Sequence, residues 1–165
     1  MLKQAILYKD ELQRKYAEAI CDDHFKFYTG ESYRHFKLEI DDNDWNSLQF
    51  VSVDSNNKII GMLGAGFNRD SRNFQGFGIM NFTKKPNVTF AKDVIQFLKN
   101  IKNVHNANRI EFMAYVGSDA EAMYQKFIMK HGGRVVGTKR RCQKLIDGKY
   151  YDSTLFEILK EDMNF

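Results

Sequence analysis

A tyrosine on a clearly marked helix is the residue of this sequence whose position most favours chemistry. Tyr124 lies in the stretch AEAMYQKFIMKHGG, where Ala120, Phe127 and Ile128 share its helical face. A phenol has a pKa of about 10, so Tyr124 could donate a proton to a basic leaving group. From helical spacing alone, the more ordinary interpretation is a buried aromatic residue with a hydrogen-bonded hydroxyl. The helix pattern leaves both roles open.

Carboxylates that could act as a general base are less clearly marked. Glu111 and Asp70 are candidates by position, although each is more typical of a surface charge, and a water chain could replace both. Tyr150 and Tyr151 could line a groove for an acceptor, or they could belong to the core beside a closing strand. Asp152 favours a role in holding a turn through hydrogen bonds from its side chain to the backbone.

Metal and nucleic-acid chemistry have little support. The four histidines do not pair with Cys, Asp or Glu at ligand spacing, so no metal site is predicted. The densest basic cluster, TKRRCQK at 138–144, is typical of a solvated strand, and its functional alternative is a contact to phosphate. No zinc-finger spacing, basic helix or stacked-aromatic RNA motif accompanies it, so nucleic acid is not an expected partner.

The composition indicates one globular intracellular domain. A chain of 165 residues is long enough for one core and too short for two, so we expect a single domain over 1–165. Its 43% hydrophobic and 28% charged residues exclude a disordered chain, and the net charge of +4 mildly favours an anionic partner. No stretch is typical of a signal peptide or a membrane span. Cys21 and Cys142 have no paired spacing, which predicts free thiols in a cytoplasmic, reducing setting.

Hydrophobic periodicity predicts alternating helices and strands. Apolar residues at three- and four-residue steps predict a helix over 5–19, and a short helix around 32–36 is a further expectation. Strands are predicted at 47–54, 58–67 and 74–82 as an antiparallel meander, in which Gly76 and Gly78 would permit a distortion. A helix with Thr89 or Asn87 as N-cap, a strand at 108–116, a helix capped by Ser118 with Glu121, and two late strands joined through DGKYYD at 147–152 follow. This order predicts a mixed α/β (α+β) fold with a mostly antiparallel sheet flanked by helices.

Two stretches carry a resemblance to a known family. In this order of elements, AEAMYQKFIMKHGGRVVG at 120–137 resembles the Tyr-x-Lys helix and glycine turn of the GNAT superfamily of acyl-CoA-dependent N-acetyltransferases. LIDGKYYDSTLFEIL at 145–159 is similar to the closing segment of the branch that acetylates protein N-termini. The resemblance covers the chain from about Leu48 to Leu159 and implies a GNAT-like sheet with acetyl-CoA as co-substrate.

The resemblance also implies where the donor would bind. Acetyl-CoA would lie in a V-shaped opening between the strands at 74–82 and 108–116, with its pyrophosphate at the start of the next helix. Tyr124 would protonate the departing sulfur, and Glu111 is the candidate base. The corresponding phosphate loop, NVTFAKDV at 87–94, has no glycine, although lysines nearby could supply charge. The residues implied to hold the donor are Asn81, Phe82, Thr83, Val88, Thr89, Phe90, Ala91 and Lys92.

Two functions therefore remain in view. The first is transfer of an acetyl group from acetyl-CoA to a primary amine, with a protein N-terminus as one candidate acceptor. The second is a GNAT-fold binding or structural module without catalysis, which the glycine-free loop and the lack of a carboxylate in GFGIMNF favour. The expected partners are acetyl-CoA, an amine acceptor and, as a further option, a second copy of the chain.

Overall fold

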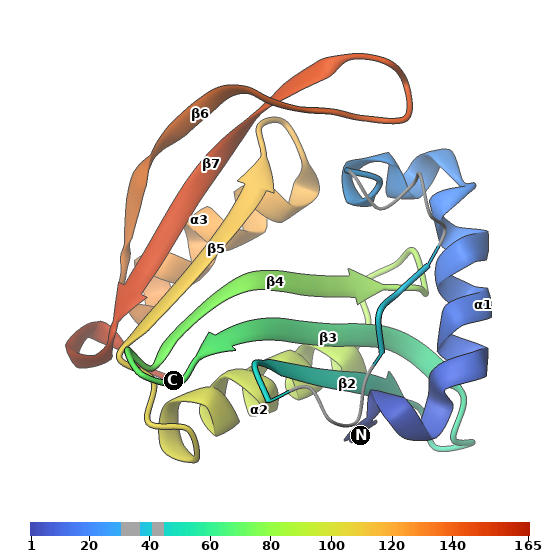
Figure 1. The fold of residues 1–165 in the computed structure, drawn as a ribbon, viewed down its shortest axis with the longest axis horizontal. Helices are drawn as coiled ribbons and strands as arrows, with labels where there is room; N and C mark the ends of the chain where they lie inside the picture. The colour runs from blue at the N-terminus through green and yellow to red at the C-terminus, as the bar shows by residue number, and fades with distance from the viewer. Residues whose placement is uncertain (31–36, 41–44) are drawn as a thin grey trace.

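The chain forms the predicted succession of elements, with additions near its N-terminus (Figure 1). The computed structural model describes residues 1–30, 37–40 and 45–165, so the helix expected around 32–36 lies outside the described residues. The elements are β1 (Leu2–Gln4), the 3-10 turn η1 (Ala5–Tyr8), α1 (Lys9–Ile20), the 3-10 segment η2 (Asp23–Tyr28), β2 (Ser47–Val53), β3 (Ile59–Asn68), β4 (Asn73–Asn81), α2 (Val88–Asn103), β5 (Arg109–Tyr115), α3 (Asp119–His131), β6 (Arg134–Lys144), β7 (Tyr150–Leu159) and the 3-10 turn η4 (Lys160–Asp162).

The strands form one seven-stranded sheet in the order β1-β2-β3-β4-β5-β7-β6. Neighbouring strands are antiparallel except for β4 and β5, which are parallel. The predicted meander of β2, β3 and β4 is confirmed, and so is the fold class of a mixed, mostly antiparallel sheet flanked by helices. Because β4 and β5 are parallel, they need a crossover connection, and α2 supplies it.

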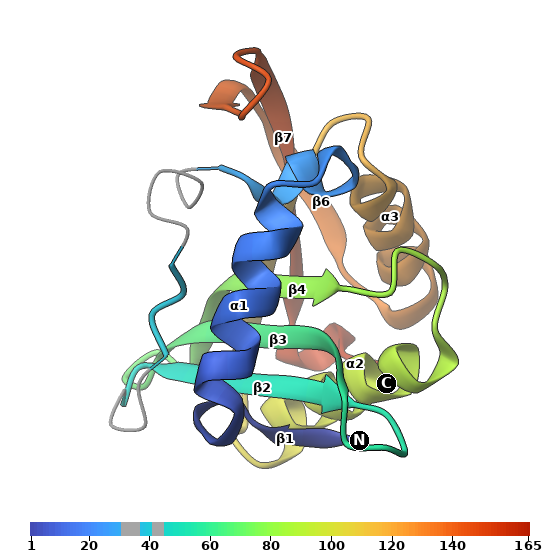
Figure 2. The ribbon, with the colours of Figure 1, turned by 90° about the vertical axis from the view of Figure 1, so that its right-hand side faces the viewer.

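Helices cover both faces of the sheet (Figures 1 and 2). On one face, α2 and α3 pack on the main core, in which the side chains of Phe74, Phe97 and Phe156 have no exposed surface. On the other face, α1 crosses β2, β3 and β4, and its Leu12 and Tyr16 are buried there. The apolar stripe predicted for the first helix is therefore the face that covers the sheet.

The two helix starts that flank the centre of the sheet follow the predicted capping chemistry. Asn87 Oδ1 accepts a hydrogen bond from the Phe90 amide at 3.0 Å, which identifies Asn87 as the N-cap of α2. Ser118 Oγ accepts from the Glu121 amide at 3.2 Å. The Glu121 carboxylate accepts from the Gly117 amide at 2.9 Å, one residue before the position of a standard capping box. Both helix starts are thus fixed by local sequence.

Two expectations need correction. The helix expected over 5–19 begins as the 3-10 turn η1 and continues as α1, and Leu2–Gln4 before it pairs with β2 as an edge strand that was not predicted. Tyr151 and Asp152 lie in β7 and not in a turn, because Asp147 closes the turn earlier by accepting from the Lys149 amide at 3.0 Å. Asp152 still bonds to backbone as expected, but its partner is the Arg141 amide on β6, at 2.7 Å. Within the described ranges, no helix combines the length and apolarity needed to cross a membrane.

Candidate active site

The centre of the sheet opens where its two parallel strands separate. β4 and β5 pair only at Asn73 with Arg109 and at Phe74 with Ile110, and beyond these positions the strands diverge. Figure 1 shows β5 turning away from β4 along this length. The facing backbone edges of both strands are therefore available to an extended ligand that carries amide groups, as in strand addition.

A bulge in β4 accompanies the separation. The pairing with β3 changes register between Gly64–Gly78 and Gly66–Gln75, so β4 carries an extra residue there. Gly76 lies in this bulge with φ of 63°, a left-handed conformation that favours glycine. The expected distortion of the strand is confirmed. It turns the second half of β4 away from the line set by its first half.

Aromatic side chains occupy this opening on the face of the sheet that α2 and α3 cover. The rings of Phe77 on β4 and Phe112 on β5 approach to 6.3 Å between centroids across the separation. Phe112 in turn stacks on Phe156 of β7 at 5.4 Å. A ligand between the strands would therefore rest on an apolar, aromatic floor on this face.

Tyr124 lies beside that floor. It projects from α3 and makes edge-to-face contacts with Phe112 at 4.9 Å and Phe156 at 5.9 Å. Burial, with a smaller contribution from the nearby phenol of Tyr28, raises the pKa of Tyr124 well above its usual value of 10. Its hydroxyl therefore stays protonated throughout the physiological range, as a proton donor must. Tyr124 is thus a packed aromatic residue whose phenol is protonated, and its role as an acid stays a prediction.

Tyr28 was not predicted as a site residue. It ends η2 with its side chain partly exposed, and desolvation of the phenol, followed by the Asp119 carboxylate, raises the pKa of Tyr28. Tyr28 thus brings a second phenol from a distant part of the chain to the side of Tyr124. The only sequence signal is the aromatic density of HFKFY in a stretch without period, and this does not indicate where the rings point.

The start of α2 is exposed at several of the positions implied to hold the donor. Val88, Thr89, Ala91 and Lys92 are exposed on the first turn. The amides of Val88 and Thr89 have no partner inside the helix, whereas the Phe90 amide is taken by Asn87. Two backbone donors and the positive end of the helix dipole therefore face solvent there, as anion binding requires.

Phe90 has a structural position and not an exposed one. Its side chain is buried, and a Cβ on Gly61 would lie 2.2 Å from its ring. Gly61 thus makes room on β3 for Phe90, and the fit fixes the start of α2 against the sheet. Phe90 can serve a ligand only by holding this helix end in place.

The loop between β4 and α2 is held by its own side chains. Asn81 Oδ1 accepts from the Thr83 amide at 3.0 Å and from the Thr83 hydroxyl at 2.7 Å. The Asn81 side-chain amide donates to the Lys85 carbonyl at 2.8 Å. Phe82 packs against the apolar cluster on the side of the sheet covered by α1. Asn81 and Thr83 therefore shape the loop that precedes the exposed helix start.

The two carboxylates considered as bases are engaged in contacts of their own. Glu111 pairs with Arg109 at 2.6 Å, one residue past the last pair between β5 and β4. Arg109 and Arg134 also pair with the buried Glu157, at 3.8 Å and 2.7 Å, so Glu111 belongs to a charge network. Asp70 lines a polar hollow in the turn that follows β3.

Comparison with solved structures gives similar folds. A variant of the spermidine N-acetyltransferase SpeG from Vibrio cholerae matches with a TM-score of 0.60 at 20% identity, over 79% of this chain and 72% of that one. A structure described as a probable acetyltransferase matches with a TM-score of 0.69 at 16% identity, over 92% of this chain and 89% of that one. The chain has the GNAT fold.

SpeG from Vibrio cholerae has also been solved in complex with manganese ions and matches with a TM-score of 0.60 at 20% identity, over 79% of this chain and 71% of that one. No protein-family model matches the sequence, and no curated protein matches it significantly. The likeness is thus one of fold.

Proposed function

We propose that this protein transfers the acetyl group of acetyl-CoA to a primary amine. The observation that carries the proposal is the separation of β4 and β5, with the half-buried, protonated Tyr124 beside it and the exposed start of α2 following β4. Solved structures of the same fold are described as acetyltransferases, one of them acting on spermidine.

The donor would lie along the separated strands. Its amide-bearing arm would pair with the free edge of β4, and its pyrophosphate would meet the amides of Val88 and Thr89. Lys92 on the same exposed turn would add positive charge. Phe90 fills the side of this turn that faces the sheet. The phosphates would therefore bind on the side of the exposed residues, where the turn has no glycine.

The chemistry would be direct attack by a neutral amine. The amine nitrogen forms a bond to the thioester carbonyl carbon, the carbon–sulfur bond breaks, and the sulfur leaves with the electron pair of that bond. Tyr124 donates its proton, or a hydrogen bond, to the departing sulfur. The nitrogen loses one proton, and water is the acceptor that the geometry favours, because Glu111 is engaged with Arg109.

The acceptor could be a free amine, as for the spermidine N-acetyltransferase of the same fold, or a protein N-terminus. The resemblance of 145–159 to enzymes that acetylate protein N-termini favours a peptide. Tyr151 on β7 lies 5.5 Å from Phe27 of η2 between ring centroids, so the β6–β7 hairpin and η2 meet beside the site. We further propose a cytoplasmic setting, which the free thiols favour. A second copy of the chain could pair with the exposed edge strand β6 to form a homodimer.

A binding module without catalysis is the second candidate. It is favoured by the start of α2, where the amide of Phe90 is already capped and glycine is absent. Titration of acetyl-CoA by calorimetry tests both candidates, with CoA and ATP as controls. Micromolar binding, followed by acetylation of an amine or an N-terminal peptide, supports the enzyme. Binding without transfer to any amine supports the module, and no binding up to millimolar acetyl-CoA contradicts the enzyme.

A further inference from the structure

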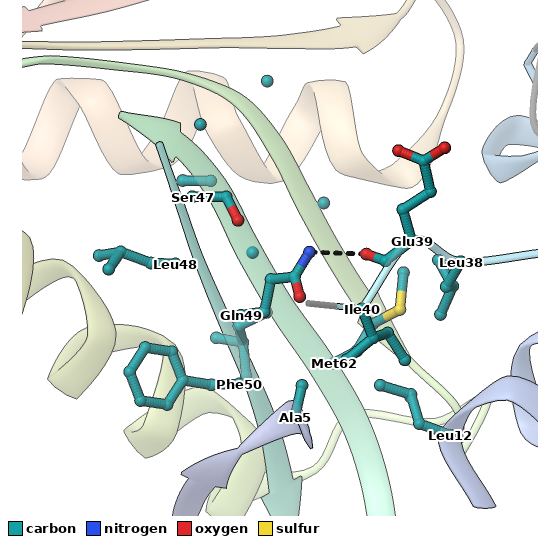
Figure 3. A pocket seen from close by; sticks show the side chains of 16 residues that line it. Ala5, Leu12, Leu38, Glu39, Ile40, Ser47, Leu48, Gln49, Phe50 and Met62 are labelled. Atoms are coloured by element: carbon teal, nitrogen blue, oxygen red, sulfur yellow. Dashed lines mark hydrogen bonds between the residues drawn. The ribbon is translucent and has the colours of Figure 1, made fainter. Parts of the chain in front are cut away.

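A hollow of about 210 Å³ lies on the face of the sheet that α1 covers (Figure 3). Its walls are apolar side chains from the N-terminal segment, from 38–40 and from β3, namely Ala5, Leu12, Leu38, Ile40 and Met62. Its lining also contains four glycines, Gly64, Gly66, Gly76 and Gly78. For comparison, an engineered apolar cavity of roughly 150 Å³ accepts benzene.

The strand register explains why few side chains fill the hollow above the sheet. Gln49 on β2 is opposite Gly64 on β3, and Gly64 is opposite Gly78 on β4. Since opposite residues share a face of a sheet, Gly64 and Gly78 leave two adjacent positions without side chains. One row further, Gly66 extends the gap on β3. The missing side chains form a trench that runs across β3 and β4.

The trench ends at the proposed reaction centre. Gly78 lies beyond the last residue of β4 that pairs with β5, so its side of the strand borders the opening between them. The bulge at Gly76 lies between this open part of β4 and the paired part. An amine whose tail lay in the trench would therefore point its nitrogen toward the separated strands.

The chemistry of the lining selects the kind of tail. Glu39 is the only charged residue among the described residues of the lining, and its carboxylate points away from Ala5 and Leu12 (Figure 3). The Gln49 side chain donates to the Glu39 carbonyl at 2.7 Å. The apolar side chains of the walls cannot compensate a charged tail for its lost hydration, whereas they pack against an apolar one.

We propose that this trench binds the tail of the acceptor, and that the acceptor class is a primary monoamine with an alkyl or aryl tail. This inference rests on the proposed acetyl transfer. A flat ring suits the glycine floor, because bare backbone allows a close approach over its width. The apolar walls then contribute the free energy of burial, which grows with the area removed from water.

A side chain placed on the floor tests the inference. A Cβ on Gly78 would meet no atom within 4 Å, so Gly78→Val fills the trench without a clash in the fold. Gly137 on β6 is equally open and far from the trench, which makes Gly137→Val the matched control. We expect Gly78→Val to raise KM for 2-phenylethylamine at least tenfold without a change in the Kd for acetyl-CoA. In Gly137→Val, both KM and Kd should equal the wild-type values. An unchanged KM, or spermidine or an N-terminal peptide used more efficiently than 2-phenylethylamine, would overturn the inference.

Binding can also be followed without turnover. Met62 lines the trench, so its labelled methyl resonance should shift on addition of 2-phenylethylamine and should not shift in Gly78→Val. A shift in a protein that does not bind acetyl-CoA would retain the trench as a binding site and refute the transferase. Acetyl transfer to 2-phenylethylamine with no shift at Met62 would retain the transferase and refute the trench.

Discussion

Replacing Tyr124 with Phe separates its packing role from its chemical role. The rings of Phe112 and Phe156 contact the Tyr124 ring, and all of these contacts survive the substitution. Only a hydroxyl in largely apolar surroundings is lost. We therefore expect the free energy of unfolding to change by no more than about 1 kcal/mol, and the Kd for acetyl-CoA to stay the same.

The expected loss of turnover follows from the pKa. A positioned proton donor contributes about 10²- to 10⁴-fold, and it works best when its pKa is close to that of the group it serves. Burial raises the pKa of Tyr124 well above 10, so proton transfer to a thiolate is less favourable than from an ordinary phenol. The lower end of the 10²- to 10⁴-fold range therefore applies. We expect kcat to fall about 100-fold in Tyr124→Phe, which corresponds to an increase of about 2.7 kcal/mol in the activation free energy.

The pH dependence has a definite sign. Protonated Tyr124 is the active form, and a raised pKa extends that form to higher pH. Between pH 8 and 10, the pH profiles of kcat for the wild type and for Tyr124→Phe should therefore have the same shape, because Tyr124 does not lose its proton in this range. Initial rates of thiol release with a saturating amine provide the assay. Tyr8→Phe is the control, because the Tyr8 hydroxyl bonds Asn57 on the surface, at 2.5 Å. Full activity in a folded Tyr124→Phe protein would refute the acid role.

Three further predictions concern the fold and the donor site. Gly61→Ala should destabilise the protein by about 1–3 kcal/mol in denaturant unfolding, because its Cβ would lie 2.2 Å from the Phe90 ring; an unchanged midpoint would mean that α2 shifts freely. Burial, followed by Arg69, lowers the pKa of His105, so below about pH 6.5 the unfolded chain binds more protons than the folded one and the free energy of unfolding should fall with pH. His105→Gln should reduce this dependence of the free energy of unfolding on pH. An unchanged dependence would mean that another group causes it. Lys92→Glu should weaken acetyl-CoA binding about tenfold in calorimetry while Lys99→Glu, exposed further along α2, does not; equal affinities would move the phosphates away from this turn.

The sequence by itself determined the type and limits of most elements, because these depend on local chemistry. The Asn87 and Ser118 caps and the end of α3 at Gly132, where φ is 87°, each involve groups close in the chain. Hydrophobic periods of 2 and 3.6 assigned the strands and helices for the same reason. The resemblance around Tyr124 added the fold, which the arrangement of β4, α2 and β5 bears out.

The tertiary structure decided which residues meet. Pairing between strands sets Gly64 opposite Gly78 and ends the β4–β5 contact at Phe74, and register between distant segments is not written in either segment alone. Packing buries Phe90 over Gly61, and it brings Tyr28 beside Tyr124 although 96 positions separate them in the chain. Local sequence fixes the conformation of a segment, whereas burial, pKa and the shape of a site depend on neighbours that only folding brings together.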